Sequence, residues 1–224
     1  MKTLTKEMQG ALTPSKAIEL LKDGNKRFVN NLKINRNLLQ QVNETSDGQH
    51  PFAIVLSCID SRTSAELIFD QGLGDIFSAR IAGNVLNEDI LGSMEFACKV
   101  AGAKVIVVLG HSKCGAIKGA CDDVKLGNLS VLLEKIKPAI NAETTITVNR
   151  NASNSNFVEC VARLNVILTM NRVMEESPLL KEMIDNNEIG IVGGMYNVDS
   201  GEIEFYEKDQ LIASGDILTA DAVN

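Results

Sequence analysis

The sequence lacks several features that would place it in particular classes of protein. No apolar run approaches the roughly 18 residues that a membrane helix needs, so we expect no membrane partner. The first seven residues, MKTLTKE, contain no apolar segment of a secretory signal, which favours a cytoplasmic location. A Gly-, Ser- or Pro-rich linker is also missing. Because 224 residues can form one substantial core, we predict a single domain.

An excess of basic residues is missing as well. The net charge is −7 and the isoelectric point is about 5.0, so the chain would repel phosphate backbones and no nucleic-acid partner is expected. An apolar fraction of 45% and a mean hydropathy of +0.04 are ordinary for a globular protein in water. This balance suggests a soluble cytoplasmic enzyme.

The number of cysteines excludes a simple disulfide framework. There are five, an odd number in a mid-sized chain without an export signal, so their thiols should be ligands or core groups. Cys98 and Cys160 stand in apolar surroundings and are expected in the core. Cys121 lies two helical turns after Cys114, where a place in the core or behind a site is favoured over a ligand.

The apolar pattern predicts alternating strands and helices, which is typical of a largely parallel sheet covered by helices. Expected strands cover residues 52–57, 75–81, 104–109, 189–196 and 202–205, the last forming an antiparallel hairpin. Expected helices cover residues 13–29, 63–69, 88–100, 115–121, 128–137 with a break at Pro138, 157–177 and 179–184. The fold class is therefore α/β with about five strands.

Within the single domain we expect three regions. Residues 1–48 form a helical arm, residues 49–206 the α/β core and residues 207–224 a C-terminal tail. The arm has few apolar positions for its length, so we expect it to pack on a partner subunit, and the segment 30–49 should be a polar connection.

Two loops that follow apolar strands carry the chemically active side chains. The first is Cys58-Ile59-Asp60-Ser61-Arg62 and the second is Gly110-His111-Ser112-Lys113-Cys114-Gly115. In open α/β sheets, ligands gather beyond the carboxyl ends of the strands. Two thiols and an imidazole suit zinc, so Cys58, His111 and Cys114 form a candidate metal site. The alternative is two buried core thiols and an ordinary loop histidine.

Asp60 and Arg62 lie close enough to the candidate site to reach an open metal position. Arg62 could hold the Asp60 carboxylate ionised, so that it accepts a hydrogen bond from metal-bound water. Alternatively, Asp60 could itself be the fourth zinc ligand, or the two residues could form a surface ion pair. The residues alone leave these three possibilities open.

Two glycine patterns do not support nucleotide binding. Gly110 and Gly115 have the spacing of a phosphate loop, but Ala116-Ile117 stands where Lys-Ser/Thr is required. Gly72-Leu73-Gly74 lacks the third glycine of a dinucleotide fingerprint. We therefore reject both readings.

The two active loops resemble those of the β-class carbonic anhydrases. Residues 58–62 match the family motif Cys-x-Asp-Ser-Arg and residues 111–115 match His-x-x-Cys-Gly, at the expected separation. The similarity extends from about Thr13 to Tyr206. It implies a largely parallel sheet surrounded by helices, in a homodimer or a dimer of dimers (a homotetramer) with active sites at the subunit interface.

The resemblance also implies a reaction and roles for particular residues. Cys58, His111 and Cys114 would hold a single Zn²⁺ in each chain, and Asp60 with Arg62 would form the catalytic dyad that orients a zinc-bound hydroxide. The implied reaction is the reversible hydration of carbon dioxide to bicarbonate and a proton, a lyase reaction. The substrate contacts implied by the family are Gln49, which could act across the dimer, the backbone N–H of Gly115, and the apolar positions Phe77, Ala82 and Phe96.

One departure from the family pattern concerns regulation. Members with an allosteric bicarbonate pocket have a tryptophan three residues before the first zinc cysteine, where this chain has Val55 and no tryptophan elsewhere. That departure favours the subtype whose zinc stays open. Two alternatives remain: hydrolysis of a related heterocumulene such as carbonyl sulfide or carbon disulfide, and a zinc-binding regulatory module without turnover.

Overall fold

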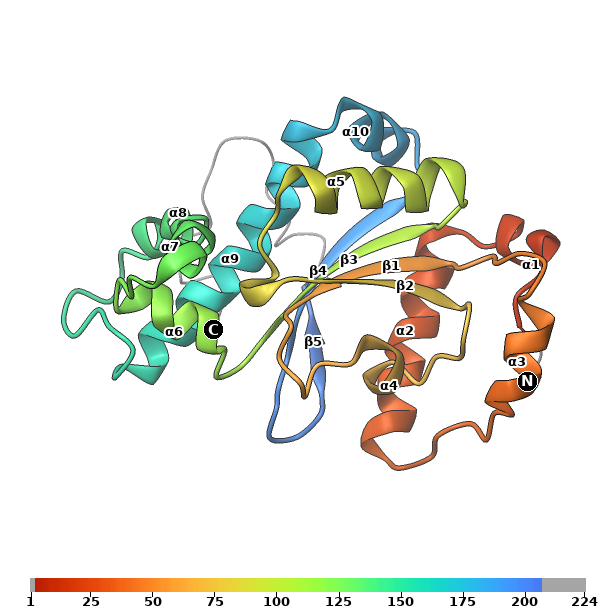
Figure 1. The fold of residues 1–224 in the computed structure, drawn as a ribbon, viewed down its shortest axis with the longest axis horizontal. Helices are drawn as coiled ribbons and strands as arrows, with labels where there is room; N and C mark the ends of the chain where they lie inside the picture. Colours follow the sequence, from red (N-terminus) through yellow and green to blue (C-terminus); the bar gives the residue numbers. More distant parts are fainter. Residues whose placement is uncertain (1–2, 207–224) are drawn as a thin grey trace.

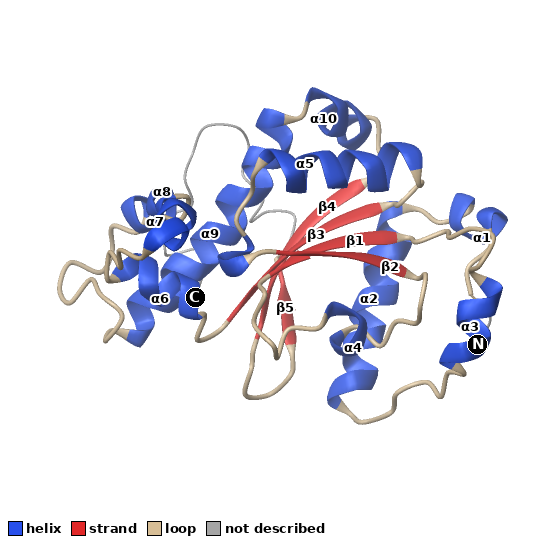
Figure 2. Cartoon of the chain, viewed as in Figure 1, coloured by secondary structure: helices blue, strands red, loops and turns tan. Residues whose placement is uncertain are grey.

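A five-stranded sheet forms the centre of the chain (Figures 1 and 2). The computed structural model describes residues 3–206, so the predicted tail at 207–224 lies outside the described residues. In the order β2-β1-β3-β4-β5, the first four strands are parallel and β5 is antiparallel to β4. The strands are β1 (Ala53–Ser57), β2 (Ile76–Arg80), β3 (Val105–His111), β4 (Gly190–Tyr196) and β5 (Ile203–Phe205). The predicted α/β fold with a mostly parallel sheet is confirmed.

Helices cover both faces of the sheet and both of its ends. They are α1 (Lys6–Gly10), α2 (Pro14–Val29), α3 (Leu38–Glu44), α4 (Ala65–Ile68), α5 (Glu88–Glu95), α6 (Gly115–Cys121), α7 (Gly127–Glu134), α8 (Lys137–Ala142), α9 (Ser155–Glu176) and α10 (Pro178–Asp185), with short helical turns η1 (Ala82–Asn84) and η2 (Phe96–Val100). Figure 1 shows α6, α7 and α8 beyond the carboxyl ends of the parallel strands, with α1 and α3 at the opposite end. No helix within residues 3–206 is long and apolar enough to cross a bilayer.

Alternation along each strand creates the two apolar layers of the core. In β1, Ala53 and Val55 face α2 and α4, whereas Ile54 and Leu56 face α5 and α10. All five residues of β1 are buried, as are all seven of β3. Strands covered on both faces read as continuous apolar runs, which explains why both were readily predicted from the sequence.

Two predictions about the helices are corrected by the structure. The segment 30–49 is not only a polar connection, because it contains the helix α3. Asn37 caps the start of this helix: its side chain accepts a hydrogen bond from the backbone N–H of Gln40 at 3.0 Å. Pro138 does not end a helix; it stands in the first turn of α8, where proline's missing N–H has no intrahelical partner to lose.

The arm contacts the core of its own chain. Ala17 and Leu21 of α2 are fully buried in the layer beneath the sheet. Buried amide side chains hold the rest of the arm in place: the Gln9 amide donates to the carbonyl oxygens of Pro51 and Ala101 at 2.7 and 2.8 Å. Contact between the arm and a partner subunit stays a prediction.

A buried ion network connects the arm to the loop before β2. The Asp70 side chain is 3% exposed and accepts hydrogen bonds from Arg27 Nε at 2.6 Å, Arg36 Nη1 at 2.5 Å and the backbone N–H of Ile34 at 3.2 Å. Burial raises the pKa of Asp70, but these hydrogen bonds outweigh it and leave the pKa below its ordinary value. Two cations therefore depend on one ionised carboxylate.

We expect Asp70→Asn to lower the free energy of unfolding by about 3 kcal/mol at pH 7, because it leaves the Arg36 guanidinium, 7% exposed, without its carboxylate. Since the folded-state pKa of Asp70 is depressed, the wild-type advantage is present above the unfolded value of about 3.9 and should shrink as pH falls through and below it. Urea unfolding at pH 7 and pH 3 measures both effects. Asp23→Asn is the matched control, since its ion pair with Lys26 is exposed and worth less than about 1 kcal/mol. Equal losses in the two variants would contradict the prediction.

Candidate metal centre

Cys58, His111 and Cys114 come together at the carboxyl edge of the sheet. Cys58 directly follows β1, His111 is the last residue of β3, and Cys114 precedes the first turn of α6. Because β1 and β3 are adjacent and parallel, with Ser57 opposite Leu109, their ends bring the three side chains to one point. Their ligand atoms lie within 4.8 Å of one another and all three residues are buried.

The geometry of the group fits a tetrahedral metal ion. The two sulfur atoms are 3.9 Å apart, and two sulfurs each about 2.3 Å from a tetrahedral zinc would be separated by about 3.8 Å. His111 Nε2 is buried without a hydrogen-bond partner. A buried ring nitrogen without a partner is costly unless something else occupies its lone pair. A metal ion between the three ligand atoms would satisfy it.

The two thiols are within hydrogen-bonding distance of each other, with their sulfur atoms 3.9 Å apart. The hydrogen bond with Cys114 lowers the pKa of Cys58, with smaller contributions from His111 and the Gly83 N–H. The same hydrogen bond, together with burial, raises the pKa of Cys114. A metal ion binds thiolates, so binding at this position would be accompanied by proton release.

The turn η1 supports Cys58 in a way that the motifs did not reveal. The backbone N–H of Gly83 donates to Cys58 Sγ at 3.3 Å, and Asn165 Nδ2 holds the Gly83 carbonyl oxygen at 2.9 Å. Gly83 has φ +67°, and a Cβ there would lie 2.9 Å from a methyl group of Ile136. Only glycine brings the N–H this close to the sulfur without strain.

Asp60 faces Arg62 and lies outside the group of three ligand atoms. The Arg62 guanidinium donates from Nε to Asp60 Oδ1 at 2.9 Å and from Nη2 to Oδ2 at 2.8 Å, while the Arg62 backbone N–H also reaches Oδ1 at 3.0 Å. These bonds hold the pKa of Asp60 well below its usual range. The carboxylate is therefore ionised, oriented and turned toward the guanidinium.

Two further residues fix the loop that carries Asp60. Arg80 donates to the carbonyl oxygens of Cys58 at 3.0 Å and of Asp60 at 2.6 Å. The hydroxyl of Thr63 donates to the same two oxygens at 3.0 and 2.9 Å. The sequence offered one signal for Arg80, its place at the carboxyl end of β2 next to the strand that precedes Cys58.

Ala82 and Gly115 lie beside the ligands, as their predicted roles require. Ala82 begins the turn η1, next to the Gly83 N–H that reaches Cys58. Gly115 follows Cys114 as the first residue of α6, where a backbone N–H has no acceptor within the helix. Both positions are at least partly accessible to solvent.

Gln49 lies at the other end of β1. It is exposed and precedes the strand, whereas Cys58 follows it. The five steps along the chain from Ala53 to Cys58 span roughly 16 Å of extended backbone, which exceeds the reach of a glutamine side chain. Gln49 therefore cannot contact the metal group of its own chain.

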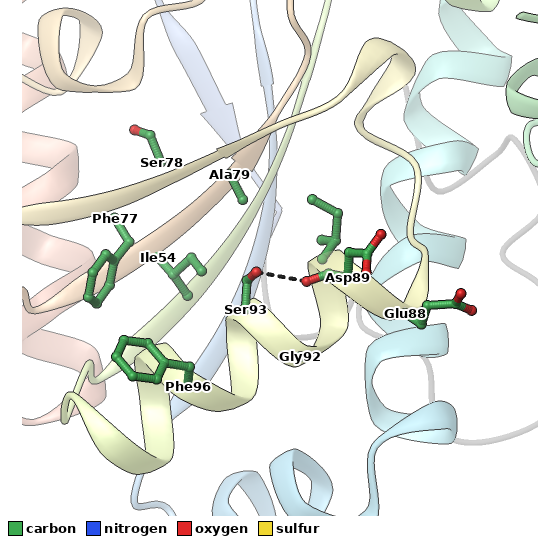
Figure 3. Close-up of a pocket in the computed structure, with 10 residues that line it drawn as sticks. Ile54, Phe77, Ser78, Ala79, Glu88, Asp89, Gly92, Ser93 and Phe96 are labelled. Carbon is green, nitrogen blue, oxygen red and sulfur yellow. Dashed lines mark hydrogen bonds between the residues drawn. The ribbon is translucent and has the colours of Figure 1, made fainter. Parts of the chain in front are cut away.

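Phe77 and Phe96 face each other in a separate groove between β2 and α5 (Figure 3). Their ring centroids are 6.3 Å apart, and the groove has a volume of about 750 Å³. Phe77 is opposite Ile54, four residues and roughly 13 Å before Cys58 along β1. Within one chain, these two rings do not border the metal group.

The other cysteines lie outside the group. Cys98 is 2% exposed in the layer under α5, and burial raises its pKa to about 12. Cys121 is half-buried against the core, and burial raises its pKa to about 11. The placement of Cys98 and Cys121 agrees with the prediction for these two thiols. Cys160 was also expected in the core, but it is only half-buried.

Comparison with known proteins decides the family. The sequence model described as carbonic anhydrase matches residues 53–203, which is more than half of the chain and includes all three ligands of the candidate metal centre. This chain is a member of the β-class carbonic anhydrase family. We therefore interpret the cysteine-histidine group by comparison with the zinc enzymes of this family.

Relatives match along most of their length. The chain is 36% identical to carbonic anhydrase 2 of Mycobacterium tuberculosis over 196 residues, covering 84% of this chain and 90% of the relative. It is 34% identical to a carbonic anhydrase of Mycolicibacterium smegmatis, covering 85% and 92%. The similarity therefore extends beyond the predicted core of residues 49–206.

Solved β-carbonic anhydrases have the same fold. The β-carbonic anhydrase CcaA superimposes with a TM-score of 0.66 at 25% identity, covering 87% of this chain and 95% of that one. A β-carbonic anhydrase from Sordaria macrospora, described as tetrameric, superimposes with a TM-score of 0.62 at 26% identity and covers 71% and 82%.

Proposed function

We propose that this chain is a zinc-dependent enzyme that reversibly hydrates carbon dioxide to bicarbonate and a proton. The observation that carries the proposal is the three-residue ligand group with a nearby carboxylate that is turned away from it. Cys58, His111 and Cys114 supply three ligand atoms, whereas Asp60 is bound by Arg62. A structural zinc site normally has four protein ligands, while a catalytic one keeps a position free.

The donor set favours zinc. Two thiolates and one imidazole are a combination that selects zinc over magnesium or calcium, which prefer oxygen. When bound in such a site, zinc lowers the pKa of water to about 7 and so supplies a nucleophile at neutral pH. The Ser112 carbonyl oxygen, 2.9 Å from His111 Nδ1, fixes the proton on Nδ1 and leaves Nε2 to bind the metal.

The chain's own residues orient the reactants. Asp60 is ionised and can only accept, so it takes a hydrogen bond from the attacking oxygen and fixes the direction of the remaining lone pair. Arg62 holds that carboxylate away from the metal position. The free N–H of Gly115 donates to an oxygen of the substrate, where negative charge develops as bicarbonate forms.

We also propose a homo-oligomer in which the partner subunit completes each site. Gln49, Phe77 and Phe96 are implied substrate contacts, yet none of them reaches the metal group of its own chain. The tetrameric description of the Sordaria macrospora relatives supports assembly, and a cytoplasmic location stays a prediction.

Stopped-flow carbon dioxide hydration tests the proposed function, with carbonyl sulfide and carbon disulfide turnover measured beside it. Zinc-loaded protein should hydrate carbon dioxide far faster than protein stripped with a chelator, and added zinc should restore the rate. Turnover of carbonyl sulfide or carbon disulfide without carbon dioxide hydration would assign a heterocumulene hydrolase instead. Bound zinc without any turnover would indicate a regulatory binding module.

A further inference from the structure

The direction of His111 Nε2 depends on one backbone oxygen. The ring Nδ1 lies 2.9 Å from the carbonyl oxygen of Ser112. A carbonyl oxygen can only accept, so Nδ1 carries the proton and Nε2 has the free lone pair. If the Ser112 peptide rotates, the ring follows it or loses this bond. The orientation of the ligand is therefore set by whatever fixes Ser112.

Ser112 is fixed by two further hydrogen bonds to the connection between β4 and β5. Its N–H donates to the carbonyl oxygen of Tyr196 at 2.9 Å, and its hydroxyl oxygen accepts from the N–H of Val198 at 3.0 Å. The backbone ladder of β3 ends here, because the next residue, Lys113, turns away with φ +58°. The hydroxyl takes the place of the next backbone acceptor and extends the ladder by one bond.

The connection between β4 and β5, which Ser112 contacts, is itself fixed by hydrogen bonds. Asn197 N–H donates to the Glu202 carbonyl oxygen and Gly201 N–H to the Asn197 carbonyl oxygen, both at 2.8 Å. From the other side, the buried amide of Asn25 on α2 donates to the Gly201 carbonyl oxygen at 2.9 Å and accepts from Ile203 N–H at 2.9 Å. The N–H of Val198 therefore lies in a turn whose two ends are fixed by hydrogen bonds.

We propose that Ser112 is a positioning residue for His111, acting through its hydroxyl bond to Val198. The inference rests on the proposed zinc site and adds a residue that its motif does not single out. The exposed ion pair between Lys113 and Asp199, which joins the same two loops, contributes little because both side chains are more than half exposed. The partly buried hydroxyl bond carries the constraint.

Three variants of the zinc-loaded protein test the role. Ser112→Ala removes the hydroxyl. Ser112→Thr retains the hydroxyl, and a cavity of about 160 Å³ beside residue 112 has room for the added methyl. Ser200→Ala is the control: it removes a hydroxyl from the β4–β5 connection that forms hydrogen bonds only within that connection. We expect Ser112→Ala to lower zinc affinity roughly 10–100-fold in competition with a chelator, as other supporting contacts of metal ligands do. The cobalt-substituted form should show shifted visible absorption bands, since these report ligand geometry. Ser112→Thr and Ser200→Ala should match the wild type in both measurements.

Wild-type affinity and an unshifted cobalt spectrum in Ser112→Ala would overturn the proposal, as would equal losses in Ser200→Ala. If Ser112→Ala does not fold, hydrogen–deuterium exchange on the wild type decides. Coupling is reciprocal, so removal of zinc should speed exchange at residues 197–201 but not in α10, and unchanged exchange at 197–201 would refute the role. A wild type that binds no zinc would instead refute the proposed function.

Discussion

Cys114→Ala should leave a folded protein that no longer retains zinc through dialysis. The cysteine supplies one of three ligand atoms within 4.8 Å of one another, and two remaining ligands cannot hold the ion in a tetrahedral site. We expect zinc content, measured by atomic emission, to fall from near one ion per chain to near zero, with loss of carbon dioxide hydration. Cys121→Ala is the control, because that thiol lies outside the ligand group. Full zinc retention in Cys114→Ala would remove Cys114 from the ligand set.

Asp60→Asn should have the opposite pattern, with zinc retained and turnover lost. Asparagine keeps the shape but loses the charge that binds the Arg62 guanidinium through two hydrogen bonds, so the side chain is no longer a fixed acceptor. By analogy with other positioned proton acceptors, we expect kcat/KM for carbon dioxide to fall roughly 10²–10⁴-fold. Because the pKa of wild-type Asp60 is depressed, its carboxylate stays ionised throughout the neutral range, and rate changes between pH 6 and 9 should report a different group.

Stopped-flow kinetics of Asp60→Asn, with zinc content measured on the same sample, separates the three possibilities that the sequence left open. Ser61→Ala is the matched control, since Ser61 lies in the same loop and is exposed. An unimpaired rate would exclude Asp60 from catalysis. Loss of zinc together with the rate would favour Asp60 as a ligand.

The sheet and the position of the ligands could be predicted because both follow from local patterns. β1 and β3 are buried on both faces, so their sequences are uninterrupted apolar runs, and the polar residues that follow them are conspicuous. Parallel strands place their carboxyl ends at one edge, so Cys58 and His111 were expected to meet there. The structure places their ligand atoms within 4.8 Å of each other and of Cys114 Sγ.

The supports of the site could not be predicted, because they come from distant segments and use backbone atoms. The Gly83 N–H that reaches Cys58 is 25 residues away in the chain, and the Asn165 amide that holds Gly83 is 82 residues further on. Neither contact leaves a periodic trace in the sequence. The helix α3 was missed for a related reason, since its buried residue is the polar Gln41, which packs on the loop at Gly72, whereas its apolar residues Leu38, Leu39 and Val42 are exposed.

The substrate residues show the limit of reasoning on one chain. Gly115 directly follows the ligand Cys114, so its proximity to the metal group follows from the motif. Ala82 was assigned by resemblance and lies in the separate turn η1, which carries no ligand. Gln49, Phe77 and Phe96 were also assigned by resemblance, and they lie away from the metal group of their own chain. In the proposed homo-oligomer, the partner subunit would bring its own copies of these residues to the site, and no pattern within one chain encodes such contacts.

X-ray absorption at the zinc edge tests most directly whether Cys58, His111 and Cys114 hold a zinc ion with one position free. The account predicts two sulfur neighbours at about 2.3 Å, an imidazole nitrogen at about 2.0–2.1 Å and one further light atom. Added iodide should replace that light atom and appear as a new heavy neighbour of the metal. A spectrum that iodide leaves unchanged would mean that a protein group such as Asp60 fills the fourth position, and a shell without two sulfurs would contradict the ligand set.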